Sequence, residues 1–229
     1  MLGHVAPTPY DLRFSLFGIP IRVHPFFWIM TALMGWDGDE IQLTFIWIGC
    51  VFLSILVHEF GHALTARYFG WPPEVVLYHF GGYAAFQPHW GYTTGRAIFV
   101  LLNGPGAGFL LYGVTLIVQY MLVKNRLFPE DETQRWYVLY ALFQMKYINL
   151  WWGLVNLLPV FPLDGGQIAR HLITQWRRHD GWEMSLKLSL ITAIGVAVYF
   201  FMHDVRYAGL MFALLAVSSY QELQQGMYR

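Results

Sequence analysis

The 229-residue chain is poor in charged residues. Asp, Glu, Lys and Arg make up only 12% of it, against about 25% in an ordinary soluble domain. Hydrophobic residues make up 56% and occur in long runs rather than in short periodic stripes, which favours membrane-spanning helices over a soluble core. The formal net charge is zero and no basic stripe is present, so nucleic acid is not an expected partner.

Cysteine is almost absent. The one cysteine, Cys50, lies inside an apolar run, so an internal disulfide or a cysteine-based metal site is excluded. We interpret Cys50 as a small buried hydrophobic residue. The first residues also lack the basic segment and apolar core that together predict a cleavable signal peptide.

The apolar runs predict an all-α integral membrane protein with about six transmembrane helices, because one span needs about 20 apolar residues. The segment after the second helix, residues 71–95, is rich in glycine, proline and aromatic residues and contains β-prone stretches. It predicts a short re-entrant β-segment. The predicted spans cover residues 25–36, 41–69, 96–123, 136–158, 184–202 and 205–217, and a further helical stretch follows Gly165-Gly166 to about Arg178.

The positions of Lys and Arg set the expected orientation, since these residues are enriched in cytoplasmic loops. With six spans, most of them lie on the cytoplasmic side if the N-terminus is cytoplasmic. Both termini are therefore predicted to be cytoplasmic, and the second helix ends at the cytoplasmic face. Lys146 falls inside a predicted helix, where it would snorkel toward the interface or pair within the bundle.

The second predicted helix carries the sequence His58-Glu59-Phe60-Gly61-His62. Residues four apart share one helix face, so both imidazoles can reach one metal ion, as in the HExxH helices of zinc enzymes. Glu59 is then placed to take a proton from a zinc-activated water. The alternative is a polar patch that pairs with another helix. The metal is favoured because it offsets the cost of burying these groups in an apolar helix.

A catalytic zinc site has three protein ligands and an open position for water. Of the 14 Asp and Glu residues, all but Glu59 and Asp164 fall at termini, in loops or at expected helix ends. Asp164 follows a segment broken by Pro159 and Pro162, and such irregular backbone is tolerated at membrane depth where it lines a cavity. Asp164 is the predicted third ligand, with an N-cap of the following helix as the alternative. Two histidines and one carboxylate suit a single Zn²⁺ per chain.

HEFGH, followed further on by NLLPVFPLDGG at residues 156–166, resembles the site-2 protease family of intramembrane zinc metalloproteases. The resemblance covers most of the chain and implies one protease domain over residues 1–229, with a motif core at about 41–178 and C-terminal helices at about 184–217. Residues 17–25, Phe80-Gly81-Gly82 and Asn103-Gly104-Pro105 resemble further family segments.

The chain departs from the family pattern at two positions. It has Gly108 and Phe161 where the family often has Asn and Pro. Neither position is a proposed ligand, but both concern how a substrate is positioned.

The resemblance also implies roles for individual residues. His58, His62 and Asp164 would bind zinc. Glu59 would act as the general base, and Asn156 would stabilise the oxyanion or hold substrate.

Substrate contacts are implied as well, at Gly81, Gly82 and Asn103. The glycine strand would offer its backbone edge to an unwound substrate segment, as in β-strand addition.

The family hydrolyses peptide bonds in or near transmembrane segments of other membrane proteins. The resemblance therefore implies regulated intramembrane proteolysis in a multi-pass protein of a bacterial or archaeal cell membrane. Its expected partners are transmembrane-helix substrates, the lipid bilayer, and an upstream protease or regulatory membrane protein. Rival hypotheses are a catalytically silent scaffold, against which the intact Glu59 speaks, and a metal transporter, which would be expected to show internal repeats.

Overall fold

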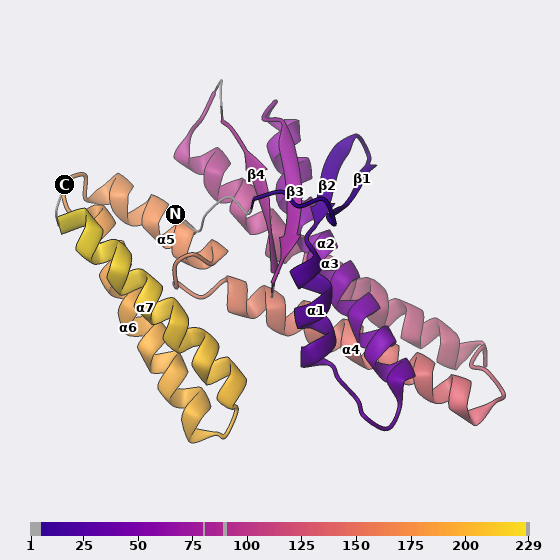
Figure 1. Ribbon diagram of the computed structural model, residues 1–229. Coiled ribbons are helices and arrows are strands. Elements are labelled where there is room, and N and C mark those ends of the chain that lie inside the picture. Colours follow the sequence, from indigo (N-terminus) through magenta and orange to yellow (C-terminus); the bar gives the residue numbers. More distant parts are fainter. Residues whose placement is uncertain (1–5, 80, 89–90, 228–229) are drawn as a thin grey trace. The chain divides into compact units, whose positions relative to one another are not determined.

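The computed structural model describes residues 6–79, 81–88 and 91–227 of a mostly helical chain (Figure 1). Phe80, quoted above with the glycine pair, lies outside the described residues. The elements follow the order β1 (Leu12–Leu16), β2 (Ile19–Val23), α1 (Pro25–Met34), α2 (Ile41–Tyr68), β3 (Pro73–Tyr78), β4 (Gly81–Phe86), α3 (Thr94–Lys124), α4 (Glu132–Asn156), α5 (Asp164–Trp176), α6 (Gly181–Met202) and α7 (Arg206–Met227).

The helices lie where the apolar runs predict them, but the all-α class is too narrow. Four strands form one sheet in the order β1-β2-β3-β4, in which β2 and β3 are parallel and the other two pairs are antiparallel. β3 and β4 are the β-segment predicted after the second helix. β1 and β2 were not predicted from the sequence because each has only five residues, although Ile19, Ile21 and Val23 of β2 are buried and alternate with Pro20 and Arg22.

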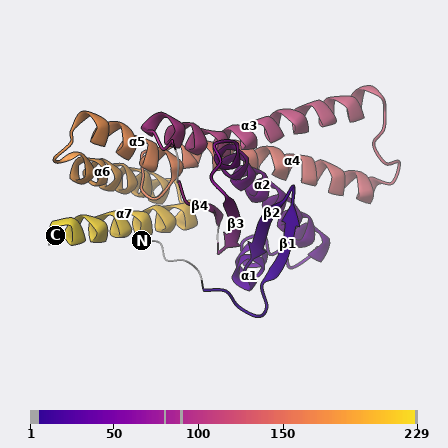
Figure 2. The ribbon, with the colours of Figure 1, turned by 90° about the horizontal axis from the view of Figure 1, so that it is seen from above.

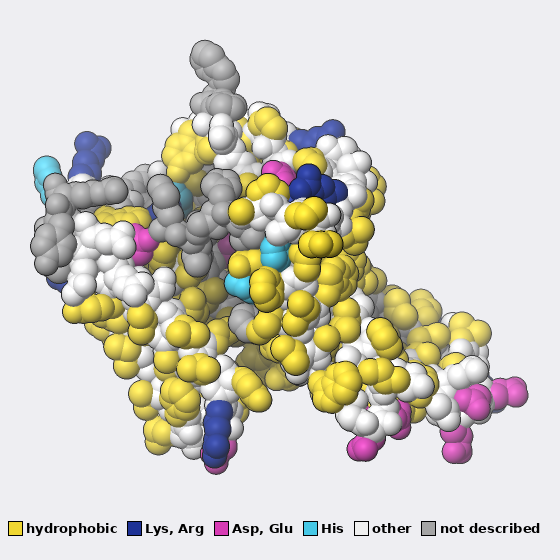
Figure 3. All heavy atoms as spheres, in the orientation of Figure 1, with side chains coloured by type: hydrophobic (Ala, Val, Ile, Leu, Met, Phe, Trp, Pro, Cys, Tyr) yellow, Lys and Arg dark blue, Asp and Glu magenta, His cyan; other side chains and the backbone are white. Residues whose placement is uncertain are grey.

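Three of the described helices, α2, α3 and α6, are long and apolar enough to cross a membrane, and α1 is a shorter apolar helix. Six spans therefore remain a prediction. Hydrophobic side chains cover much of the visible flanks of the helices, whereas acidic side chains gather at the ends of helical hairpins (Figure 3). This distribution fits helices surrounded by lipid.

Contacts within the chain divide it into two compact units. The first holds the sheet, α1, α2 and the α3–α4 hairpin from Leu102 to Gly153, and the second holds Thr93–Leu101 and the chain from Leu154 onward. In both ribbon views α3 and α4 run side by side, as do α6 and α7 (Figures 1 and 2).

In the first unit the sheet packs against α2. The Arg67 guanidinium donates a hydrogen bond to the carbonyl of Phe17 in the β1–β2 turn, where Gly18 adopts a φ of 73° that suits glycine. The turn is thereby attached to the C-terminal end of α2. The buried core of this unit comprises Ile19, Ile21, Val23, Phe27, Ile55, Leu56, Phe60, Ala63, Val75 and Leu77.

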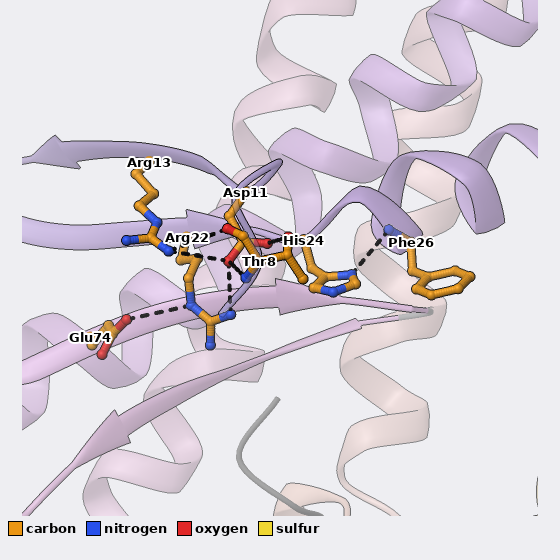
Figure 4. A network of polar contacts seen from close by, with 7 residues as sticks. All are labelled: Thr8, Asp11, Arg13, Arg22, His24, Phe26 and Glu74. Atoms are coloured by element: carbon orange, nitrogen blue, oxygen red, sulfur yellow. Dashed lines mark hydrogen bonds and ion pairs between the residues drawn. The ribbon is translucent and has the colours of Figure 1, made fainter. Parts of the chain in front are cut away.

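A polar network fixes the start of β1 to the neighbouring strands (Figure 4). Asp11 accepts hydrogen bonds from the backbone N–H and the hydroxyl of Thr8, at 2.9 and 2.6 Å, and from Arg22 at 3.2 Å. Arg22 also approaches Glu74 of β3, with 3.8 Å between its Nε and Oε1. Burial raises the pKa of Asp11, but the Thr8 hydrogen bonds and the Arg22 charge outweigh it and lower the pKa from 3.8 to about 2.

Replacing Asp11 tests this network. Because its pKa is lower in the folded chain, the ionised carboxylate stabilises the fold above about pH 4, and this contribution is lost as the pH falls toward 2. Asp11→Asn should lower the thermal unfolding midpoint at pH 7 by roughly 2–4 °C, the shift expected from about 1 kcal/mol in a chain of this size. The variant should also lose less stability than the native protein between pH 4 and pH 2. Equal acid sensitivity of the two proteins would contradict the assignment.

Candidate metal site and catalytic residues

The three polar residues of HEFGH lie on a buried part of α2. His58, Glu59 and His62 are 3%, 4% and 6% exposed. The Nε2 atoms of the two histidines lie 3.2 Å apart. Two Zn–N bonds of 2.0–2.1 Å at a tetrahedral angle place their nitrogens about 3.3 Å apart, so the imidazole pair fits one zinc ion without rearrangement.

Asp164, the predicted third ligand, is a buried carboxylate of the second compact unit. Asp164 is the first residue of α5, and the N-cap position belongs to Leu163, with no side chain capping the helix. The alternative role as an N-cap is therefore not the one that Asp164 adopts.

Glycines bring α3 close to the histidines. A Cβ on Gly104 would overlap the imidazole of His62, and a Cβ on Gly61 would overlap the backbone carbonyl of Asn103. Gly61 of HEFGH is thus required by the approach of α3 rather than by the metal. Asn103, a predicted substrate contact, places its backbone against α2 at this crossing.

Strand β4 passes directly beside the predicted general base. A Cβ on Gly82 would lie 2.9 Å from Cγ of Glu59 and 2.7 Å from Cδ2 of Leu77, closer than side chains tolerate, so only glycine allows this approach. Among the described strands β4 pairs with β3 alone, so it is an edge strand of the sheet. Gly81 lies beside the Trp152 ring, where a Cβ would be 3.3 Å from the indole.

The glycine pair of LDGG has a steric role. A Cβ on Gly165 would overlap the carbonyl of Leu157, and a Cβ on Gly166 would lie 2.5 Å from the backbone nitrogen of Phe161. The start of α5 therefore packs tightly on the proline-broken segment that precedes Asp164. Asn156, the predicted oxyanion or substrate residue, is buried and is the last residue of α4.

Lys146, whose role the sequence left open, and His24 both have structural partners. Lys146 Nζ donates a hydrogen bond of 2.7 Å to Oε1 of Gln119 on α3, which is pairing within the helical hairpin. His24 is the N-cap of α1, and its Nδ1 accepts a 3.1 Å hydrogen bond from the N–H of Phe26 (Figure 4).

A polar link between α4 and α2 was not predicted from the sequence. The buried Asn149 donates from Nδ2 to Oγ of Ser54, at 2.9 Å, one turn before His58. A sequence signal exists, because Asn149 lies two helical turns before Asn156 on the same face of α4.

Comparisons with known proteins show which family the chain resembles. A family model described as Peptidase family M50 matches residues 123–202. Stage IV sporulation protein FB of Bacillus subtilis is 31% identical over 215 residues, which are 92% of this chain and 68% of that protein. A zinc metalloprotease of Methanocaldococcus jannaschii is 29% identical over 174 residues, which are 72% of this chain and 46% of that protein. The chain thus spans about two thirds of the first relative's length and less than half of the second's.

A solved structure shares the fold. The site-2 protease from Methanocaldococcus jannaschii superposes with a TM-score of 0.57 at 21% identity, over 93% of this chain and 95% of that one. Taken with the sequence matches and the histidine pair on α2, this likeness leads to one assignment. The chain belongs to peptidase family M50, the site-2 protease family of zinc metalloproteases.

Proposed function

We propose that this chain is an intramembrane endopeptidase that hydrolyses peptide bonds in or near transmembrane segments of other membrane proteins. The observation that carries the proposal is the buried His58, Glu59 and His62 set on α2, a helix long and apolar enough to span a bilayer. Ionisable groups at membrane depth are costly and usually functional. Membership of a zinc metalloprotease family supports the same chemistry.

His58, His62 and Asp164 would hold one Zn²⁺. Two imidazoles and one carboxylate are a donor set that zinc favours, and such a site would keep a position for water or substrate. When bound, the ion lowers the pKa of a coordinated water to about 7 and polarises the carbonyl of the scissile bond.

The chain's own residues carry the proton steps. The Glu59 carboxylate accepts a proton from the attacking water and then passes it to the leaving amine, which is the role of a general base and acid. Its burial keeps bulk water from competing for that proton. Asn156 would donate its side-chain amide to the oxyanion that develops at the scissile carbonyl.

The β4 edge would bind the substrate. A helical peptide bond is shielded by its own hydrogen bonds, so the substrate must unwind locally before it can be cut. An unwound segment could add to the outer edge of β4 through main-chain hydrogen bonds. Because Gly82 lies against Glu59, a segment bound there would have its peptide bonds next to the base.

The proposed setting is a multi-pass protein of a bacterial or archaeal cell membrane with both termini in the cytoplasm. Substrates would be transmembrane-helix proteins, with an upstream protease or a regulatory membrane protein as a further partner. The position of Glu59 beside Gly82 of β4 supports the protease over the scaffold and transporter alternatives.

Glu59→Gln tests the base. The variant should lose cleavage of a reconstituted membrane substrate by about 10²–10⁴-fold, because a general base contributes a factor of that size. Zinc content should stay unchanged, since the glutamine leaves both histidines and Asp164 in place. Cleavage by the variant at the native rate would show that Glu59 is not the base.

Asp164→Asn tests the third ligand. Zinc affinity, measured by competition with a chelator, should fall by more than the roughly 10–100-fold that removal of an outer-shell partner costs. Asp180→Asn is the matched control, because Asp180 is an exposed carboxylate paired with Arg177 at 3.2 Å. The ligand assignment is wrong if the two variants bind zinc equally well.

Gly82→Ala tests the approach of β4 to the base. The added methyl group would push β4 away from Glu59, so the cleavage rate should fall about tenfold or more, while zinc affinity changes little. Gly113→Ala is the control, because a Cβ there meets no atom within 4 Å. An unchanged cleavage rate in Gly82→Ala would argue against substrate binding along β4.

A further inference from the structure

The backbone before Asp164 leaves the helical hydrogen-bonding pattern. Pro159 and Pro162 have no N–H to donate, and the segment between α4 and α5 cannot continue either helix. Irregular backbone in a membrane protein needs partners for its peptide groups, because lipid offers none. The peptide groups of Phe161, in this segment, find their partners on α6 and α7. These two helices lie outside the HEFGH and LDGG motifs.

Two serines hold the backbone of Phe161. Its N–H donates to Oγ of Ser189 on α6 at 2.7 Å, and its carbonyl accepts from Oγ of Ser219 on α7 at 3.5 Å. The two hydroxyls lie 2.8 Å apart. Either hydroxyl could donate in the contact between them; when Ser219 donates to the carbonyl, Ser189 donates to Ser219. Each hydroxyl then donates once and accepts once, which closes a ring of mutually reinforcing hydrogen bonds.

The ring is shielded from solvent and supported by apolar packing. Ser189 is 1% exposed and Ser219 is 0% exposed. The neighbouring Val160 is fully buried in the core of this unit, whose other members are Ala193, Ala197, Phe212 and Ala216. The segment is therefore fixed by hydrogen bonds at Phe161 and by hydrophobic contacts at Val160.

This attachment continues to Asp164. Leu163 donates its N–H to the carbonyl of Val160 at 2.8 Å. Gly166 of α5 packs on the backbone of Val160 and Phe161 with no room for a side chain. The backbone held by the serines and the first turn of α5 thus form one packed piece.

We propose that Ser189 and Ser219 are positioning residues for the metal ligand Asp164. The pair acts on the backbone of Phe161 and touches neither metal nor substrate. The inference rests on the proposed function to the extent that Asp164 binds zinc. In this proposal α6 and α7 help to position the metal ligand Asp164 through Ser189 and Ser219.

Removing either hydroxyl should loosen the segment and the carboxylate that follows it. In Ser189→Ala the Phe161 N–H loses its acceptor, and in Ser219→Ala the carbonyl loses its donor. We expect faster hydrogen–deuterium exchange of the Phe161 amide in the full-length, zinc-free protein. We also expect a zinc dissociation constant raised about 10–100-fold, the loss typical of residues that orient a ligand.

The double variant separates a ring from two independent contacts. If the hydroxyls act as one ring, either substitution opens it. The double variant Ser189→Ala/Ser219→Ala should then lose no more zinc affinity than the single variant with the larger loss.

Ser185→Ala is the matched control. Ser185 is buried on the same helix, but its Oγ donates to the carbonyl of Trp182 at 2.7 Å, one turn away on α6.

The outcomes are distinct. Faster Phe161 exchange and weaker zinc binding in both single variants, with Ser185→Ala unchanged, support the proposal. Unchanged exchange or unchanged zinc affinity in the serine variants overturns it. If Ser189→Ala does not fold, Ser219→Ala, which removes only the longer 3.5 Å bond, carries the same test.

Asp164→Asn, measured alongside, keeps this inference apart from the proposed function. Native zinc affinity in Asp164→Asn would remove the ligand assignment itself. A loss there, together with native affinity in the serine variants, would overturn the positioning role alone.

Discussion

The burial of ionisable and polar groups in an apolar, helical protein is the constraint on which the other features depend. His58, Glu59 and His62 are almost fully buried on a helix that can span a membrane. Such groups need compensation that lipid cannot give. A shared metal ion would provide it for the two imidazoles, and the 3.2 Å between their Nε2 atoms suits that arrangement.

The same constraint explains the glycines around the site. Side chains would separate the metal-bearing helix from its neighbours, so close approach is restricted to positions without a Cβ. Gly104 allows α3 to reach the imidazole of His62, and Gly82 allows β4 to reach Glu59. Gly166 packs the start of α5 on the broken segment before Asp164. The motif glycines therefore shape the site without taking part in its chemistry.

Much of the site could be predicted from the sequence, because a buried carboxylate or histidine in an apolar run is conspicuous. The search for carboxylates within apolar segments led to Glu59 and Asp164. The long apolar runs predicted the positions of the helices to within a few residues. The β1–β2 hairpin was not predicted, since strands of five residues leave no long apolar signal. The roles of Ser189 and Ser219 were not predicted either, because a serine in an apolar helix looks like any other small residue until its hydrogen-bond partner is known.

The proposed mechanism depends most on the identity of the metal ligands. X-ray absorption spectroscopy of the purified protein would determine them without any substrate. The account predicts one zinc per chain, with two imidazole nitrogens at about 2.0–2.1 Å and carboxylate oxygen at about 2.0–2.2 Å. A spectrum that lacks the two imidazoles, or a purified native protein that binds no zinc, would contradict it.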